Sequence, residues 1–246
     1  MKTAKKRRLF LLLAFCAALI LGCAVYLGDY YRADETALAA LQSSAEVTVE
    51  FDSDNVLFIP AAEPVTGFIF YPGGKVEHTA YAPLLQELAQ NGILCVLLEM
   101  PFRLAVLDMN AAEGIPAELA SRFPDVTHWY IGGHSLGGSM AASHLSKTLP
   151  DSPYHGLVLL ASYSTADLRA SKAISLYGTQ DQVLNPEKYT KYRSNLPADT
   201  AEILLGGGNH ANFGSYGTQK GDGMASLSAA EQVEMTVQYL LEFFWE

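Results

Sequence analysis

The chain has 246 residues, of which 50% are hydrophobic, a length that suffices for the core of one α/β domain and is short for two. Five of its 16 Lys and Arg and none of its 26 Asp and Glu lie in residues 1–27, so residues 28–246 hold 11 basic and 26 acidic side chains, a formal charge of −15. This charge excludes nucleic acid as a natural partner, and it excludes a basic patch as the means of holding the domain to anionic lipid.

The N-terminal residues join a basic cluster to a long apolar run. Five basic side chains lie within residues 2–8, and an uncharged run follows over residues 9–27. This length suits a membrane-spanning helix, and it exceeds the apolar region of roughly 7–15 residues in a cleavable signal peptide. We therefore predict a basic cytoplasmic tail over 1–8 and an uncleaved, single-pass transmembrane signal anchor over 9–27. The rest of the chain would then lie on the extracytoplasmic side of the cell membrane.

Two alternatives remain open for this segment. The tetrapeptide ILGC at 20–23 resembles the lipobox of bacterial lipoproteins, in which Cys23 would be lipidated and would become the first residue of the mature chain. A cleaved signal peptide is the other alternative. Against the lipobox, the apolar run continues through residues 24–27, where lipoproteins usually become polar. The anchor and the lipoprotein both tether the domain to the membrane.

After a linker over residues 28–46 with a short helix, we predict a single domain over 47–246. Apolar β-branched runs alternate there with helical patterns. Strands are predicted as a leading hairpin and six further runs, over residues 47–51, 56–59, 67–71, 93–99, 128–132, 156–162, 173–177 and 201–205. Helices are predicted over residues 81–91, 104–122, 135–149, 186–196 and 228–244. The alternation indicates an α/β fold with a mostly parallel twisted sheet and helices on both faces.

The pentapeptide GHSLG at 133–137 lies between a predicted strand and a predicted helix. This is the setting of a nucleophile elbow, a tight turn that projects a serine above the carboxyl edge of the sheet. Gly133 and Gly137 suit the turn because a Cβ there would clash with the neighbouring strand and helix. The pattern predicts Ser135 as a nucleophile, and the alternative is a glycine-rich turn that only packs a helix on a sheet.

An elbow predicts an acid and then a histidine, each in a loop after a later strand. Asp181 follows the strand over 173–177, and His210 follows the strand over 201–205 through three glycines. We predict that Asp181 orients His210 and that His210 takes the serine proton as general base. As alternatives, Asp181 could only form a turn, and His78 is a rival base, although it precedes the serine in the chain.

Acyl transfer also needs N–H donors aimed at the oxyanion. The backbone N–H of Leu136, directly after the nucleophile, is the first predicted donor. The second is expected from the loop after the strand over 67–71, where the N–H of Gly74 is the first choice and that of Lys75 the second. The alternative is that Gly73 and Gly74 only form the turn.

From about residue 67 to residue 244 the chain resembles the α/β-hydrolase superfamily, and within it the small bacterial dienelactone-hydrolase-like enzymes. The similarity lies in four motifs, YPGG at 71–74, GHSLGG at 133–138, GTQD at 178–181 and GNH at 208–210. The resemblance implies hydrolysis of esters or related carbonyl compounds without a cofactor. Dienelactone hydrolases carry a cysteine nucleophile where this chain has Ser135, and Pro72 stands here in the place of the usual His of the oxyanion loop. A dienelactone substrate is therefore not expected.

Three further residues are predicted to contact the substrate. Arg103 follows a strand end and is a candidate for binding a substrate carboxylate, with a solvated arginine or a partner of Glu99 as the alternative. His134 is expected to point beside the nucleophile, and Tyr163 is expected to line the mouth of the site. Only residues 163–172 separate two strands where many members of the superfamily insert a helical cap. The cap is therefore predicted to be small or absent.

Together these residues predict a serine hydrolase that acts on small-molecule or cell-envelope carboxylic esters through an acyl-enzyme on Ser135, with no cofactor and no metal. A peptidase, an amidase or an acyltransferase would use the same three residues and stays open. A tethered binding protein without chemistry is an alternative from another class, since a fold does not imply a function. Its signature would be a broken triad, and no member is missing from this sequence.

Overall fold

The computed structural model describes residues 2–52 and 55–245. They form two compact units, one up to Tyr30 and one from Tyr31 onward. Met1, at the start of the predicted basic tail, lies outside the described residues, and so do the side chains of residues 2–5 and 7–9.

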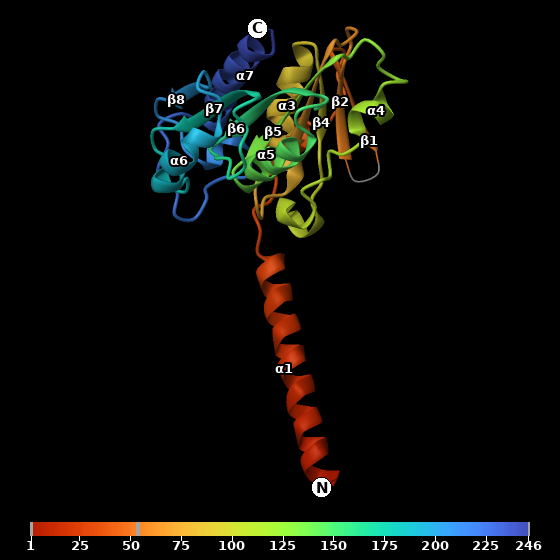
Figure 1. The fold of residues 1–246 in the computed structure, drawn as a ribbon, viewed down its shortest axis with the longest axis vertical. Helices are drawn as coiled ribbons and strands as arrows, with labels where there is room; N and C mark the ends of the chain where they lie inside the picture. Colours follow the sequence, from red (N-terminus) through yellow and green to blue (C-terminus); the bar gives the residue numbers. More distant parts are fainter. Residues whose placement is uncertain (1, 53–54, 246) are drawn as a thin grey trace. The chain divides into compact units, whose positions relative to one another are not determined.

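The first unit is a single long helix, α1 (Lys2–Gly28) (Figure 1). Its stretch Phe10–Gly28 has 19 residues, carries a mean hydropathy of 2.6 and is not buried by other parts of the chain. It is long and apolar enough to serve as a membrane anchor or as a signal sequence. The apolar run predicted over 9–27 is thus helical along its whole length.

The second unit is built on one sheet, whose eight strands in the described residues run in the order β1-β2-β4-β3-β5-β6-β7-β8. The strands are β1 (Val47–Asp52), β2 (Asn55–Pro60), β3 (Thr66–Tyr71), β4 (Ile93–Leu97), β5 (His128–His134), β6 (Tyr154–Leu160), β7 (Lys172–Gly178) and β8 (Ala201–Leu205). β2 pairs antiparallel with β1 and with β4, and all other neighbours are parallel. The predicted leading hairpin and mostly parallel sheet are confirmed.

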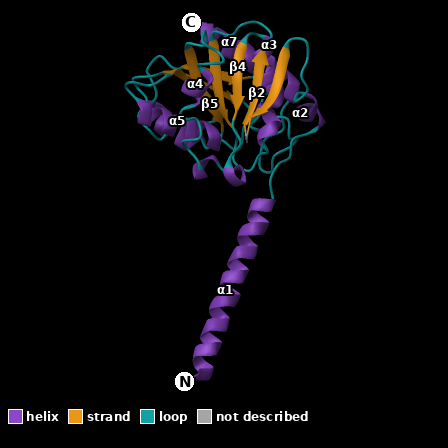
Figure 2. Cartoon of the chain, turned by 90° about the vertical axis from the view of Figure 1, so that its right-hand side faces the viewer, coloured by secondary structure: helices purple, strands orange, loops and turns teal. Residues whose placement is uncertain are grey.

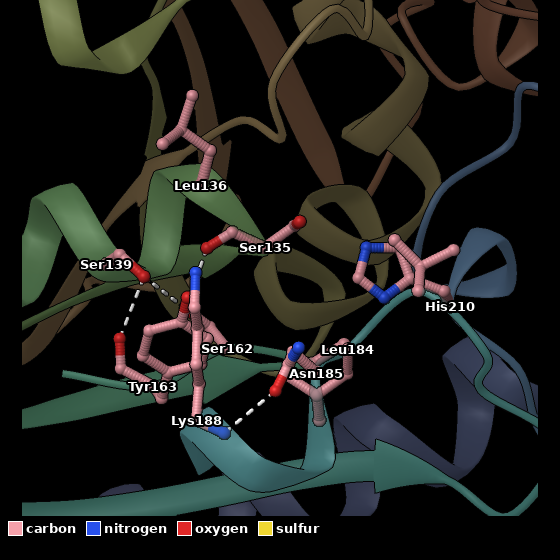
Figure 3. A pocket seen from close by; sticks show the side chains of 11 residues that line it. Ser135, Leu136, Ser139, Ser162, Tyr163, Leu184, Asn185, Lys188 and His210 are labelled. Carbon is pink, nitrogen blue, oxygen red and sulfur yellow. Dashed lines mark hydrogen bonds between the residues drawn. The ribbon is translucent and has the colours of Figure 1, made fainter. Parts of the chain in front are cut away.

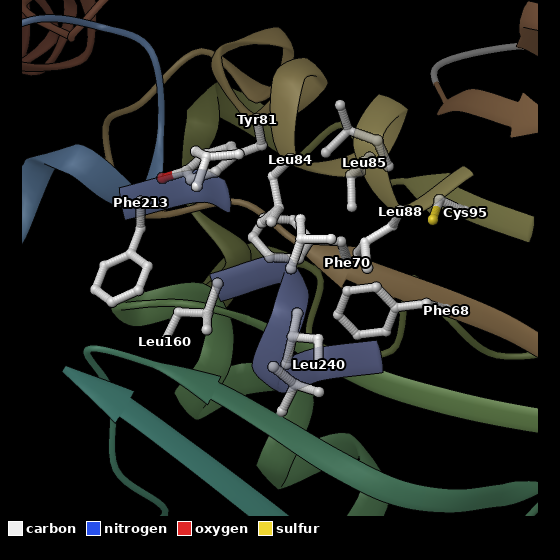
Figure 4. Packing of buried hydrophobic residues seen from close by; sticks show 14 of the residues in the cluster. Phe68, Phe70, Tyr81, Leu84, Leu85, Leu88, Cys95, Leu160, Phe213 and Leu240 are labelled. Carbon is white, nitrogen blue, oxygen red and sulfur yellow. The ribbon is translucent and has the colours of Figure 1, made fainter. Parts of the chain in front are cut away.

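Helices cover both faces of this sheet (Figure 2). On one face lie α3 (Ala82–Gln90) and α7 (Ala229–Trp245), and on the other lies α5 (Leu136–Thr148). The side chains of β3 alternate between the two layers: Phe68 and Phe70 pack with α3 and α7, as Figure 4 shows, while Ile69 packs with α5. A strand that is buried on both faces has no polar side, which explains the unbroken apolar runs in the sequence.

The region between β4 and β5 differs from the single helix predicted over 104–122. It contains 3-10 turns at Pro101–Arg103 and Ala105–Leu107 and one short helix, α4 (Ile115–Leu119). Gly114 directly precedes α4 with a φ of 83°, in the left-handed region that glycine adopts without strain. The helical apolar pattern over 104–122 is therefore interrupted by a backbone turn at Gly114.

A buried tyrosine holds this region in its loop conformation. The hydroxyl of Tyr71 donates a hydrogen bond to the Met109 carbonyl (3.0 Å) and accepts one from the Ala112 N–H (3.0 Å). The Tyr71 side chain is fully buried. These bonds satisfy backbone groups that a continuous helix would have paired internally.

The stretch predicted as a linker, 28–46, is largely part of the compact domain. It contains only one helical turn and a half, α2 (Glu35–Ala39), capped by the Asp34 carboxylate, which accepts from the Ala37 N–H (3.0 Å). Ala37 is fully buried. Upstream, Tyr31 exchanges backbone hydrogen bonds with residues on both sides of Val76, donating to Lys75 (2.8 Å) and accepting from Glu77 (2.9 Å). The domain therefore begins at Tyr31 and not at residue 47.

Candidate active site

Ser135 occupies the turn between β5 and α5. Its φ of 53° and ψ of −120° lie in a region that residues with a Cβ rarely adopt. Such a conformation costs about 1–3 kcal/mol and persists only where the surroundings enforce it. Here the Ser135 N–H donates to the Leu160 carbonyl of β6 (2.9 Å), and the Ser135 carbonyl accepts from the Ser162 hydroxyl (2.7 Å). The turn is thus fastened on both sides of the serine.

Two glycines permit the close approach that this turn requires. A Cβ on Gly133 would overlap the Tyr71 carbonyl oxygen of β3, and a Cβ on Gly137 would overlap the carbonyl oxygens of Tyr71 and Pro72. Both neighbours are backbone atoms, which cannot move aside as a flexible side chain can. The clash expected from the sequence at these positions therefore has specific partners.

The loops after β7 and β8 bring Asp181 to His210. The Asp181 Oδ2 lies 2.9 Å from the Nδ1 of His210, and both side chains are 2% exposed. The other carboxylate oxygen, Oδ1, accepts from the backbone N–H groups of Val183 and Leu184 (2.8 Å each). Three hydrogen bonds thus hold the carboxylate in one orientation and leave the Nε2 of His210 on the side that faces Ser135.

Ser135 and His210 line the same cavity. Figure 3 shows the Ser135 hydroxyl pointing towards the His210 ring. The structure therefore brings together the three residues that the sequence singles out as Ser, Asp and His. It does not bring His78, the rival histidine, into this cavity.

Two residues that the sequence analysis missed position the histidine loop. Gln232 of α7 is fully buried, accepts from the Asn209 N–H (3.0 Å) and donates to the Asn209 carbonyl (2.9 Å). Asp222 accepts from the Ala211 N–H (2.9 Å) and from the Gln182 N–H (3.2 Å), so it links the loop of the histidine to that of the acid. Neither residue stands near a recognisable motif, and only the tertiary fold reveals them.

The loop after β3 faces the elbow with one backbone donor available. The Gly73 N–H donates to the Tyr81 hydroxyl (3.0 Å), and the Lys75 N–H donates to the Arg103 carbonyl (2.8 Å). The Gly74 N–H has no acceptor among the described residues, and Gly74 lies so close to Leu136 that a Cβ would come within 3.0 Å of its side chain. Leu136 is the first residue of α5, where a helix N–H lacks an internal acceptor. The available pair is Leu136 and Gly74; Lys75, the second choice from the sequence, is already bonded.

The Tyr81 hydroxyl links this loop to the elbow. It accepts from Gly73 and lies 2.8 Å from the Nδ1 of His134. The Tyr81 hydroxyl thus bridges the Gly73 N–H and the ring of His134. Burial first, and then the neighbouring His210 ring at 4.5 Å between centroids, hold the pKa of His134 well below its usual value. A neutral ring thus lies beside His210.

The residues predicted to contact substrate separate into two groups. Tyr163 lines the cavity and stacks on Tyr192 at 5.5 Å and 15°. His134 does not line it, because its side chain is buried against Tyr81 and Phe213. Arg103 is likewise absent from the lining residues, and its φ of 60° places it in the tight turn after β4.

The cavity beside Ser135 has a volume of about 320 Å³ and is lined by eleven residues, Ser135, Leu136, Ser139, Ala161, Ser162, Tyr163, Val183, Leu184, Asn185, Lys188 and His210. Four of them, Val183, Leu184, Asn185 and Lys188, come from the start of α6 (Pro186–Tyr192) and the loop before it, and His210 comes from the histidine loop. Between β6 and β7 no described residue is helical, which confirms that a helical cap is absent there. The volume is near the lower end of ligand sites, which are typically about 300–1,000 Å³.

Comparisons with known proteins agree with this fold. Residues 67–234 match the family model described as "Alpha/beta hydrolase family". No curated protein matches the chain. Among solved structures, TT1662 from Thermus thermophilus aligns with a TM-score of 0.58 at 14% identity, over 82% of this chain and 99% of that one. Carboxyl esterase 2 from Tuber melanosporum aligns with a TM-score of 0.59 at 12% identity, over 88% and 92%. An alpha-beta serine hydrolase homologue from Coxiella burnetii aligns with a TM-score of 0.53 at 15% identity, over 81% and 99%. At these identities the solved structures show a shared fold.

Proposed function

Since the chain belongs to the alpha/beta hydrolase family, we propose that it is a serine hydrolase that cleaves carboxylic esters through an acyl-enzyme on Ser135. The observation that carries the proposal is the bond of 2.9 Å between His210 and Asp181 beside a serine in a strained elbow. A strained turn at the serine and a buried, fully hydrogen-bonded carboxylate both cost folding free energy. Such features are expected where a histidine activates a serine as general base. Within the family, the four sequence motifs favour the dienelactone-hydrolase-like group with serine in place of cysteine.

In the proposed reaction each residue would have a separate role. His210 Nε2 takes the Ser135 proton as the hydroxyl oxygen bonds to the ester carbonyl carbon. The N–H groups of Leu136 and Gly74 stabilise the oxyanion that forms. When the C–O bond to the alcohol breaks, His210 gives its proton to the leaving alkoxide. Water then attacks the acyl-enzyme with the same histidine as base, which releases the acid and restores the serine.

The neutral state of His134 supports this division of roles. During each step the neighbouring His210 becomes an imidazolium, and a second cation at 4.5 Å between ring centroids would oppose that charge. Burial holds the pKa of His134 well below its usual value. His134 therefore packs against the base without competing for its proton.

The test uses the full chain in detergent. We expect release of 4-nitrophenol from acetate and butyrate esters, and loss of this activity together with fluorophosphonate labelling in Ser135→Ala. Ser146→Ala is a matched control, because Ser146 lies on the same helix outside the cavity and its hydroxyl donates to the Ser143 carbonyl (2.8 Å). Activity retained in Ser135→Ala would refute the nucleophile assignment. An intact protein that neither turns over esters nor takes the label would favour a binding protein.

The same acyl groups presented as 4-nitroanilides separate ester from amide cleavage. Faster turnover of the ester by several orders of magnitude supports the esterase, and comparable rates would favour the peptidase or amidase. Acyl transfer would appear as a new ester of the added alcohol. The amount of this ester would rise with the alcohol concentration while the rate of 4-nitrophenol release stays constant. These arms decide among activities that the same three residues could support.

We further propose that α1 is an uncleaved membrane anchor and that the domain lies on the extracytoplasmic side. The helix continues without interruption through Cys23 to Gly28, which favours an anchor over a lipoprotein start at Cys23. Intact mass of the membrane-extracted protein distinguishes the two, since a lipoprotein would lack residues 1–22 and carry a lipid. Digestion of the domain by protease added to intact cells with a permeable outer wall is expected, and protection until lysis would refute the orientation.

A further inference from the structure

The cavity beside Ser135 has an unusual charge for this domain. Residues 28–246 carry a formal charge of −15, yet none of the described residues that line the cavity is acidic. Lys188 is the one lining residue there with a permanent charge. A cation at the substrate site of an acidic domain raises the local concentration of small anions that the rest of the surface repels.

Lys188 lies in the first turn of α6, and in Figure 3 its side chain extends from that helix into the cavity. Other cations of this region have partners: the Arg193 guanidinium pairs with Glu202, and the Lys191 ammonium lies over the Tyr192 ring at 4.9 Å. The Lys188 ammonium has neither kind of partner in the part of the chain that the structure describes. Its three N–H donors therefore remain available to a ligand.

Asn185 supplies a second donor in a fixed orientation. Its side-chain oxygen caps α6 by accepting from the Lys188 N–H (2.8 Å). Only the oxygen can accept that bond, so the NH₂ end of the amide points the other way, and in Figure 3 it faces into the cavity. The helix cap thus determines which end of Asn185 a substrate meets.

Two other serine side chains on this wall are committed to the protein. The Ser162 hydroxyl donates to the Ser135 carbonyl (2.7 Å), and the Ser139 hydroxyl donates to the Tyr163 carbonyl (2.8 Å). Neither has a donor left for a ligand. Lys188 and Asn185 therefore supply the side-chain N–H donors that an anion beside Ser135 can meet in this cavity.

We propose that Lys188 and Asn185 form a carboxylate-binding subsite, and that the preferred substrate is a small ester with a carboxylate a few bonds from the scissile carbonyl. This inference rests on the proposed esterase function and names its substrate class. The chemistry at Ser135 is unchanged, and the subsite acts by orienting the ester. It takes the role that the sequence alone suggested for Arg103, which lies outside this cavity.

The experiment compares esters that differ only in the distal charge. On the acyl side, 4-nitrophenyl hydrogen glutarate is matched with 4-nitrophenyl valerate; on the alcohol side, 4-carboxyphenyl acetate is matched with phenyl acetate. We expect the wild-type full chain in detergent to have a higher kcat/KM for the anionic member of at least one pair. The pair that shows the preference identifies the side of the scissile bond that carries the carboxylate. Added salt should raise KM for the anionic ester alone.

Lys188→Met should lower kcat/KM for that anionic ester by about tenfold, the scale of one partly exposed charge-assisted contact, and change the neutral ester by less than about twofold. Asn185→Asp is the sharper variant: aspartate caps a helix as well as asparagine does, so α6 should persist while the donor becomes a repelling carboxylate. Lys191→Met is the matched control, because Lys191 lies on α6 but not in the cavity, and it should leave both esters unchanged.

Equal effects of Lys188→Met on anionic and neutral esters, or no preference for either anionic ester in the wild type, would overturn the subsite while leaving the esterase intact. Loss of the esterase itself is recognised separately, by the absence of turnover of all four esters together with failure of fluorophosphonate labelling. Retained preference in Asn185→Asp with α6 still folded, judged by unchanged circular dichroism and melting temperature, would restrict the subsite to Lys188.

Discussion

Replacing Tyr81 by phenylalanine removes one oxygen atom that joins two parts of the site. That oxygen accepts from the Gly73 N–H (3.0 Å) and lies 2.8 Å from the His134 Nδ1. Tyr81 is fully buried, so water cannot take its place without rearrangement. The substitution therefore leaves two buried polar groups, the Gly73 N–H and the His134 Nδ1, without their partner.

The expected cost follows from these two groups. A buried polar group left unsatisfied costs about 1–3 kcal/mol, so Tyr81→Phe should destabilise the domain by about 3 kcal/mol, or roughly 10 °C in melting temperature for a domain of this size. The loop that carries Gly74 is then less firmly held. Since removing an oxyanion donor altogether costs about 10²–10³-fold in kcat, displacing it in part should lower kcat by about tenfold, with KM little changed.

Tyr71→Phe is the matched control for this prediction. Tyr71 is also fully buried, and its hydroxyl also makes two hydrogen bonds, to Met109 and from Ala112 (3.0 Å each). It should lose similar stability without losing kcat. Thermal melts and 4-nitrophenyl butyrate kinetics below the melting range measure both effects, and an alkyl boronic acid should bind Tyr81→Phe about tenfold more weakly, in step with kcat. If both variants keep kcat, or both lose it equally, Tyr81 has no specific positioning role.

Three other substitutions test the same geometry. Asp181→Asn should lower kcat by about 10³–10⁴-fold with KM little changed, and steady-state kinetics showing less than a tenfold loss would contradict the role of the carboxylate on His210. Gly137→Ala should destabilise by more than about 3 kcal/mol in urea unfolding, because its Cβ overlaps the Tyr71 carbonyl; an unchanged midpoint would show that the elbow can relax. Burial lowers the pKa of His134, so below its usual value near 6.5 the unfolded chain binds a proton that the folded chain does not, and stability should fall as pH drops from 7 to 5. This component should be absent in His134→Asn, and an identical slope in both proteins would disprove it.

The elbow and its partners could be predicted because their requirements are local. Ser135 needs glycines at fixed offsets, and Asp181 and His210 need only follow later strands, so strand prediction and chain order suffice. The irregular segments could not be predicted in this way. The sequence over 104–122 has a helical pattern, but the Tyr71 hydroxyl bonds to backbone groups of this segment and stabilises a loop instead. No periodicity within the segment encodes this tertiary contact.

Side chains that adjust the site from a distance were hidden for the same reason. In the sequence, Gln232 is one polar residue of an amphipathic C-terminal helix, and Asn185 is one residue of a turn. Nothing in the sequence distinguishes either from its neighbours. Their roles depend on what the fold places opposite them: the two backbone groups of Asn209 for Gln232, and the N–H of Lys188 for Asn185. A sequence motif marks residues that react, whereas supporting residues can be replaced by any group with the same reach.

The hydrogen bonds that hold the Ser135 turn and the His210 loop determine how stability and activity are coupled. Ser135 is held by its own neighbours in the sheet, through Leu160 and Ser162. The histidine loop depends instead on α7, because Gln232 makes two bonds to Asn209. Fraying of the C-terminal helix would therefore release His210 while leaving Ser135 in place. If His210 is the general base, mild denaturation should then abolish ester turnover before it unfolds the elbow, since His210 is the member of the proposed triad whose loop is held by α7.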